Sequence, residues 1–184
     1  MAALNTPVCN FGEKAHEFSL DSTAGKTWTI DRCRGENGLL VMFISNHCPY
    51  VKAVRHKIVR DAVELEGLGI NSVAIMPNDT VAYPADSMEN MKQAAQEFGF
   101  PFPYLLDATQ DVARAYGAVC TPDFFGYNAD LELQYRGRLD AAGARADADH
   151  EPRELFEAMK LVAETGRGPL EQVPSIGCSI KWKN

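Results

Sequence analysis

The feature that most constrains the fold is a buried strand followed at once by a helix. The continuous apolar run Leu39–Ile44 is typical of a buried strand. From Pro49 on, apolar residues recur at steps of three and four with charged residues between them, which predicts an amphipathic helix ending near residue 67 or 69. The apolar positions of this helix are Val51, Val54, Ile58, Ala62 and Leu65. Cys48 therefore stands where a strand ends and a helix begins.

The remaining patterns alternate strands and helices, then end in an antiparallel hairpin and a closing helix. The expected strands are Phe18–Leu20 and Thr27–Ile30 around a turn at Gly25-Lys26, then Asn71–Met76, Tyr104–Leu106, and Asp123–Tyr127 with Leu131–Leu139. The expected helices are Asp86–Phe98, opened by a capping box of Asp86 and Glu89, then Gln110–Tyr116, and a last helix from Glu151-Pro152 to residue 166 or 168. This order predicts an α/β fold with a mixed sheet, parallel in its first half and antiparallel at its end.

The length of the chain favours one domain. Its 184 residues can bury a sizeable core, and we expect a single domain over 1–184. No repeat, low-complexity segment or internal linker divides it. Residues 169–184 are expected to form a flexible C-terminal tail with little helical pattern, although Ile176, Ile180 and Trp182 suggest that it packs on the domain.

Composition and charge exclude several classes of protein. With 46% hydrophobic and 23% charged residues, the chain has the composition of a soluble globular protein. A net charge of −7 without a Lys/Arg cluster argues against a nucleic-acid-binding surface. No apolar stretch approaches the roughly 18–20 residues of a membrane span, and no secretory signal is visible at the N-terminus. We therefore expect a cytoplasmic protein that binds neither nucleic acid nor membrane.

Five cysteines, Cys9, Cys33, Cys48, Cys120 and Cys178, are spread along the chain. An odd number without close pairs fits neither a secreted disulfide framework nor a zinc site, so we expect no metal and no other cofactor. In a reducing compartment such cysteines are usually small buried hydrophobic residues. That is the interpretation for Cys9 and Cys33.

Cys48 has the surroundings of a reactive thiol. Pro49 occupies the first helical position, where its missing N–H costs nothing. The helix N-terminus and Lys52, one turn along, both favour the thiolate, which is the nucleophilic form of cysteine. His47 is a candidate acid–base partner, but we expect this side chain at the end of the strand to be solvated.

Several segments resemble one family over essentially the whole chain. They are Asn46–Lys52, Cys120–Phe125, Ser175–Trp182 and the stretch 12–26. Together they resemble the thioredoxin-fold redoxins of the AhpC/TSA type, in particular the proteins labelled peroxiredoxin-like or thioredoxin-family. The resemblance implies a thioredoxin-like fold with a cis-proline, Pro122, facing Cys48. It also implies an antioxidant oxidoreductase in which Cys48 attacks a disulfide or a peroxide, with thioredoxin or glutathione as reductant.

The chain departs from both branches of that family. Thioredoxins carry a second cysteine where this chain has Val51, which belongs to the apolar stripe of the helix. Peroxiredoxins carry a proline where this chain has Val41, although Ser45 matches their hydroxyl residue three positions before the cysteine. They also use an arginine that enters at about position 121. The candidates to replace it are Arg114 and Arg136.

A nucleophile without a neighbouring partner needs another thiol to resolve it. The resemblance places Cys120 close to Cys48, because Cys120 precedes the expected cis-proline by two residues. Cys178 in the tail is the second candidate, and an external thiol such as glutathione is the third. The alternative for Cys120 is a buried hydrophobic side chain, and the alternative for Cys178 is an exposed bystander.

The predicted substrate site lies at the carboxyl edge of the sheet. The strands ending at Ile44 and Met76 should be parallel neighbours, so the loop that contains Asn78 borders Cys48. Asn78 is a candidate to bind the substrate or the thiolate, and the alternative is a turn-forming asparagine. The predicted substrate-binding residues are Ser45, His47, Pro49, Tyr50, Asn78, Thr121 and Pro122. An alternative function is a non-catalytic thioredoxin-like module that binds a peptide or protein in the Cys48/Pro122 groove.

Overall fold

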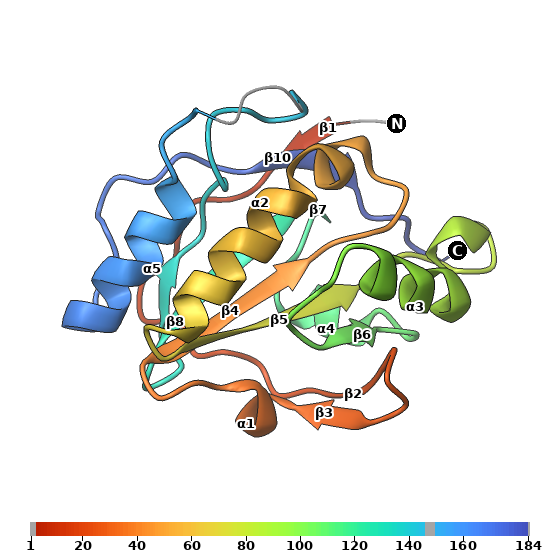
Figure 1. Cartoon of the computed structure of the whole chain (residues 1–184), viewed down its shortest axis with the longest axis horizontal. Coiled ribbons are helices and arrows are strands. Elements are labelled where there is room, and N and C mark those ends of the chain that lie inside the picture. Colours follow the sequence, from red (N-terminus) through yellow and green to blue (C-terminus); the bar gives the residue numbers. More distant parts are fainter. Residues whose placement is uncertain (1–2, 146–149, 184) are drawn as a thin grey trace.

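The structure, a computed structural model, describes residues 3–145 and 150–183. Its main sheet has seven strands in the order β3-β2-β6-β5-β4-β8-β9 (Figure 1). In chain order these strands are β2 (Ser19–Ser22), β3 (Thr27–Thr29), β4 (Gly38–Phe43), β5 (Ile70–Met76), β6 (Tyr104–Leu106), β8 (Asp123–Asn128) and β9 (Leu133–Tyr135). Strand β4 pairs parallel with β5 and antiparallel with β8, and β5 pairs parallel with β6. The mixed sheet, its N-terminal hairpin β2–β3 and the antiparallel end are confirmed.

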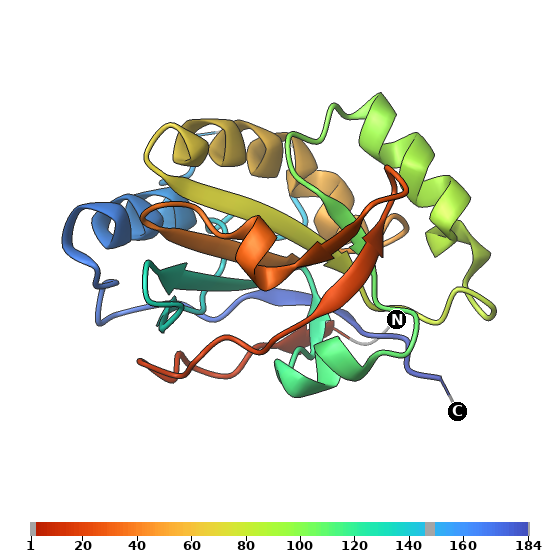
Figure 2. The ribbon, with the colours of Figure 1, turned by 90° about the horizontal axis from the view of Figure 1, so that it is seen from below.

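Helices cover both faces of this sheet. Figure 2 shows α2 (Pro49–Glu66), α3 (Met88–Glu97) and α5 (Glu154–Thr165) on one face, and α4 (Asp111–Ala115) with the C-terminal segment on the other. The short α1 (Ile30–Cys33) and the 3-10 turn η1 (Pro84–Asp86) complete the helical elements of the described residues. None of these helices is long and apolar enough to cross a bilayer.

The core is divided between the two faces by the alternation of side chains along β4. Leu40 and Met42 join the apolar cluster that contains Val51 of α2. Val41 and Phe43 point to the other face and join the cluster that contains Ala113 and Tyr116. Each fully buried side chain of this kind contributes about 1.5–3 kcal/mol. The pairing of β4 with its neighbours fixes where the chain leaves the sheet at Cys48.

A second, three-stranded sheet holds the C-terminal tail. Its order is β1-β10-β7, with β1 (Ala3–Asn5), β10 (Ile176–Ser179) and β7 (Cys120–Thr121), all antiparallel. The tail therefore packs on the domain, as its apolar residues suggest, but the expectation of a flexible segment is wrong because β10 is paired on both edges. Strand β7 leads directly into a cis peptide bond between Thr121 and Pro122.

The predicted capping box of α3 is also wrong. The helix begins at Met88, and its N-cap is Ser87, whose Oγ accepts a hydrogen bond from the Asn90 N–H at 3.4 Å. Asp86 instead ends η1 and is completely buried. A carboxyl group without solvent contact needs polar partners inside the protein, and the partners of Asp86 lie beside Cys48.

Candidate functional site

Cys48 is the N-cap residue of α2 and is completely buried. Its thiol donates a hydrogen bond to the Thr121 carbonyl oxygen at 2.9 Å, across 73 residues of sequence. Ser45 Oγ and Thr121 Oγ1 lie 3.3 Å apart, also buried. The end of β4 and the cis-proline segment thus meet around the Cys48 thiol, with Pro49 opening the helix behind it.

Cys178 reaches the same place from β10. It lies opposite Thr121 in the β10–β7 pairing, and its side chain belongs to the same buried cluster as that of Cys48. Burial, followed by the interaction with the Cys48 thiol, raises the pKa of Cys178 to about 11. The side chain is only 4% exposed, so the interpretation of Cys178 as an exposed bystander is wrong. At neutral pH the Cys178 thiol therefore holds its proton.

The close fit of β10 depends on Gly177. A Cβ atom at this position would lie 2.2 Å from the Thr121 carbonyl oxygen and 3.0 Å from the Pro122 nitrogen. Both are backbone atoms that cannot rotate away. Only glycine lets the tail approach the cis peptide closely enough to bring the next residue, Cys178, to Cys48.

Cys120 is buried nearby but belongs to the other side of β7. It lies opposite Ser179 in the strand pairing, whereas its neighbour Thr121 lies opposite Cys178. Because successive side chains of a strand point to opposite faces, Cys120 and Cys178 are on different faces. The Cys120 thiol is 3.6 Å from the Pro122 carbonyl oxygen, and burial raises its pKa strongly.

Asp86 also belongs to this site, although its sequence pattern indicates only a helix cap. Its Oδ1 accepts hydrogen bonds from the backbone N–H groups of Asn46 (2.8 Å) and His47 (3.3 Å). Its Oδ2 lies 2.6 Å from His47 Nδ1 and accepts a bond from Asn78 Nδ2 at 2.8 Å. One buried carboxyl group therefore fixes the turn that precedes Cys48.

His47 and Asn78 differ from their sequence-based interpretations. The expectation of a solvated His47 is wrong, because its ring is bound to Asp86 and stacks on Tyr83 with the ring centroids 5.5 Å apart. Asn78 is buried, and its Oδ1 accepts a hydrogen bond from the Lys181 N–H at 2.9 Å. Asn78 thereby links Asp86 to the tail three residues beyond Cys178.

The two arginines considered as substitutes are engaged with partners other than Cys48. The Arg136 Nη2 binds Asp123 Oδ2 at 3.1 Å, and its guanidinium lies over Phe125. The Arg114 guanidinium lies 4.3 Å from the centroid of the Trp182 ring.

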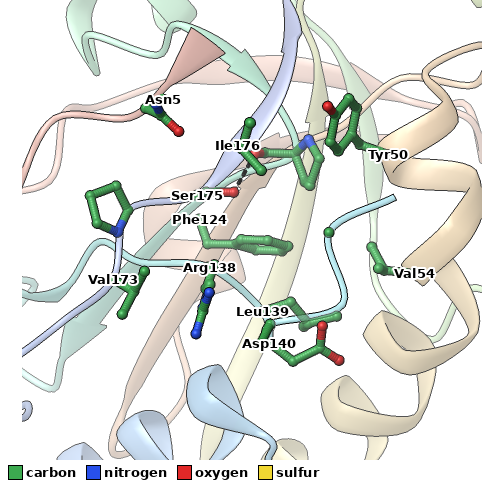
Figure 3. Close-up of a pocket in the computed structure, with 14 residues that line it drawn as sticks. Asn5, Tyr50, Val54, Phe124, Arg138, Leu139, Asp140, Val173, Ser175 and Ile176 are labelled. Atoms are coloured by element: carbon green, nitrogen blue, oxygen red, sulfur yellow. Dashed lines mark hydrogen bonds between the residues drawn. The ribbon is translucent and has the colours of Figure 1, made fainter. Parts of the chain in front are cut away.

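A cavity of about 230 Å³ lies beside the tail and the cis-proline. Figure 3 shows Tyr50 and Val54 of α2 on one side of it and Ser175 and Ile176 of the tail on another. Ser175 Oγ donates to the Pro122 carbonyl oxygen at 2.9 Å. The charged groups that line the cavity are neutralised in pairs, Arg138 with Glu154 and Asp140 with Lys57. Of the predicted substrate-binding residues, Tyr50 and Pro122 lie here.

Two neighbouring thiols can lose two electrons and two protons to form a disulfide. A peroxide or another disulfide can accept those electrons. Both thiols are almost inaccessible, so the oxidant must be small or β10 must move.

Comparisons with known proteins show the family and the fold of the chain. The sequence model of the AhpC/TSA family matches residues 11–141. A crystal structure of an uncharacterized conserved protein from Geobacillus kaustophilus is 42% identical, with a TM-score of 0.92 over 100% of this chain and 97% of that one. The peroxidoxin BcpB of Mycobacterium tuberculosis is 14% identical, with a TM-score of 0.64 over 86% and 98% of the two chains. The thioredoxin domain of a thiol-disulfide oxidoreductase from Bacteroides vulgatus is 16% identical, with a TM-score of 0.57 over 68% and 86%. The fold is thioredoxin-like. No curated protein matches the chain.

Proposed function

Because the chain belongs to the AhpC/TSA family, we propose that it is a thiol-dependent oxidoreductase with Cys48 as nucleophile and Cys178 as resolving thiol. The observation that supports this pairing is the position of Cys178, which lies opposite Thr121, the residue whose carbonyl oxygen accepts the Cys48 thiol, with both cysteine side chains buried. Cys178, with its raised pKa, is the protonated member of the pair. Cys48 at the helix N-terminus is the member placed for attack.

Cys48 and Cys178 can react with either class of substrate, a peroxide or a disulfide. With a peroxide, the Cys48 thiolate attacks one oxygen, the O–O bond breaks, an alcohol or water leaves and Cys48 becomes a sulfenic acid. The Cys178 sulfur then displaces water and forms the disulfide. With a disulfide substrate, Cys48 forms a mixed disulfide and Cys178 releases the second thiol. Two equivalents of an external thiol, or one dithiol such as reduced thioredoxin, restore the protein.

The geometry favours Cys178 over Cys120 for the second role. Cys178 lies opposite Thr121, whose carbonyl oxygen accepts the Cys48 thiol, whereas Cys120 lies on the opposite face of β7. We further propose that the protein works in the cytoplasm, where glutathione and thioredoxin supply the reducing equivalents. All five cysteines are free thiols in the structure.

The test is mass spectrometry of the reduced protein after one equivalent of hydrogen peroxide. We expect a crosslink between the peptides of Cys48 and Cys178 in the wild type and in Cys120→Ser, which is the matched control. In Cys178→Ser we expect a sulfenic acid on Cys48, and in Cys48→Ser no oxidation. A Cys48–Cys120 crosslink in the wild type would refute the assignment of Cys178. A Cys48 that reacts with neither peroxide nor disulfide would favour the binding-module alternative.

A further inference from the structure

A second cavity, of about 300 Å³, borders the turn before Cys48. Ser45 and Asn46 line it from this turn, and the Ser45 hydroxyl is also the neighbour of the Thr121 hydroxyl. The carbonyl of Thr121 in turn accepts the Cys48 thiol. The other lining residues are Ile44, Val51, Lys52, Arg55, Ala94, Glu97, Phe98, Phe100 and Tyr104. The cavity therefore lies between α2 and α3, one residue layer from the proposed nucleophile.

Two cations line this cavity without a carboxylate partner. In the described part of the chain, neither Lys52 nor Arg55 forms an ion pair, although Glu97 also lines the cavity. The arginines further along, such as Arg60 and Arg153, are paired with Asp61. A formal excess of positive charge at this cavity contrasts with the net charge of −7 of the chain.

Arg55 is held in place although it has no ion pair. Its guanidinium lies over the Phe98 ring, 3.3 Å from the ring centroid. Such a contact orients the planar group and leaves its N–H groups free to bind a ligand. The hydroxyl of Tyr104 is already used, because it donates to Asn46 Oδ1 at 3.0 Å. The donors still available in the cavity are therefore mainly cationic.

A guanidinium fixed on an aromatic ring, with an ammonium one turn away, is suited to bind a carboxylate. The volume is at the lower limit of small-molecule pockets, which span about 300–1,000 Å³. It accommodates a fragment of the size of an amino acid or a short carboxylic acid.

Resting on the function proposed above, we propose that this cavity binds the carboxylate group of a small anionic thiol that reduces the Cys48–Cys178 disulfide. The thiolate of the ligand attacks the Cys48 sulfur, the disulfide breaks, and Cys178 leaves and takes up a proton. A second thiolate attacks the ligand sulfur of the mixed disulfide, releases Cys48 and forms the oxidised, disulfide-linked ligand. Two electrons pass from two small thiols to the protein disulfide.

The rate of this reduction tests the proposal with two thiols of similar size. The oxidised protein is mixed with 3-mercaptopropionate, which carries a carboxylate, or with the uncharged 2-mercaptoethanol, and the loss of the disulfide is followed by thiol labelling. We expect the ratio of the two rates to fall about tenfold in Arg55→Gln, the effect of losing one charge-assisted hydrogen bond. Lys92→Gln removes one exposed charge from α3 outside the cavity and should keep the wild-type ratio. An unchanged ratio in Arg55→Gln, or an equal fall in Lys92→Gln, would overturn the proposal.

Binding is measured separately, so that it does not depend on redox activity. 3-(Methylthio)propionate, which carries a carboxylate and is of the size of the thiols above but cannot exchange thiols, is titrated into the reduced protein, and amide shifts are recorded by NMR. We expect shifts at the amides of residues 45, 52 and 55 that disappear in Arg55→Gln. Their absence in the wild type refutes the cavity as a ligand site. A protein that binds the probe here but forms no Cys48–Cys178 disulfide would instead contradict the proposed function and, with it, the role of the ligand as reductant.

Discussion

Replacing Gly177 by alanine should separate the two thiols without touching either of them. The added Cβ would lie 2.2 Å from the Thr121 carbonyl oxygen and 2.6 Å from its carbonyl carbon. Ordinary contacts of a Cβ begin at 3.4 Å, so β10 must move by about 1 Å away from the cis-proline segment. The atoms that block the new methyl group belong to the backbone, so rotation of a side chain cannot relieve the clash.

That displacement should slow disulfide formation strongly. A disulfide requires Cβ atoms about 3.5–4.5 Å apart and a defined dihedral angle, and a misplacement of 1 Å in a reacting pair can cost about 100-fold in rate. We expect the oxidation of the Cys48–Cys178 pair by peroxide to fall about 10- to 100-fold in Gly177→Ala. The overpacking should also lower the free energy of unfolding by about 1–3 kcal/mol.

The assay is quenched-flow oxidation with one equivalent of peroxide, in which the crosslinked peptide is measured by mass spectrometry. Gly67→Ala is the matched control. Gly67 follows α2 with an ordinary φ of −62°, and its new Cβ would meet no atom closer than 3.3 Å. Disulfide formation at the wild-type rate in a folded Gly177→Ala protein would refute the reasoning that β10 must sit against the cis peptide.

Three further substitutions test other parts of the site. In Asp86→Asn the new side-chain NH₂ group faces the His47 and Asn78 groups that contact the wild-type carboxylate. We expect the free energy of unfolding, measured in urea, to fall by about 3 kcal/mol. Burial raises the pKa of the Asp123 carboxyl from 3.8 to about 6, so folding is favoured while this group is protonated. On the order of 3 kcal/mol of this stability should be lost as the pH rises from about 4 through 6. The unfolding free energy of the wild type minus that of Asp123→Asn should therefore fall between these two pH values. Val51→Cys should create a disulfide between Cys48 and the introduced thiol that competes with the Cys48–Cys178 disulfide, as detected by peptide mapping. Absence of the new disulfide would show that the buried side of α2 keeps position 51 away from Cys48.

The sequence predicts those parts of the fold that depend on local periodicity. The run through β4 and the repeat of α2 are continuous, so the position of Cys48 between them follows directly. The same local reasoning fails for Asp86, because an acidic residue three positions before Glu89 matches a capping box. Its actual role depends on a loop meeting the end of another strand, and sequence spacing carries no signal of that contact.

The tail could not be placed for a related reason. Strand β10 pairs with β7, whose residues lie 57 positions earlier in the pair Thr121–Cys178. The four residues of β10 show no clear alternation, because Gly177 is required by a close approach rather than by a hydrophobic pattern. The apolar residues of the tail predict that it packs, but the position on which it packs depends on tertiary structure alone.

The contact between the two buried thiols bears on how the protein withstands oxidative damage. A sulfenic acid that meets a second peroxide becomes a sulfinic acid, which thiols do not reverse. Here the strand that covers Cys48 is also the strand that carries Cys178. An oxidant that reaches Cys48 leaves its product against a second sulfur, whereas another peroxide molecule would have to penetrate the same cover again. We expect condensation to precede over-oxidation, so that the protein keeps cycling in a large excess of peroxide.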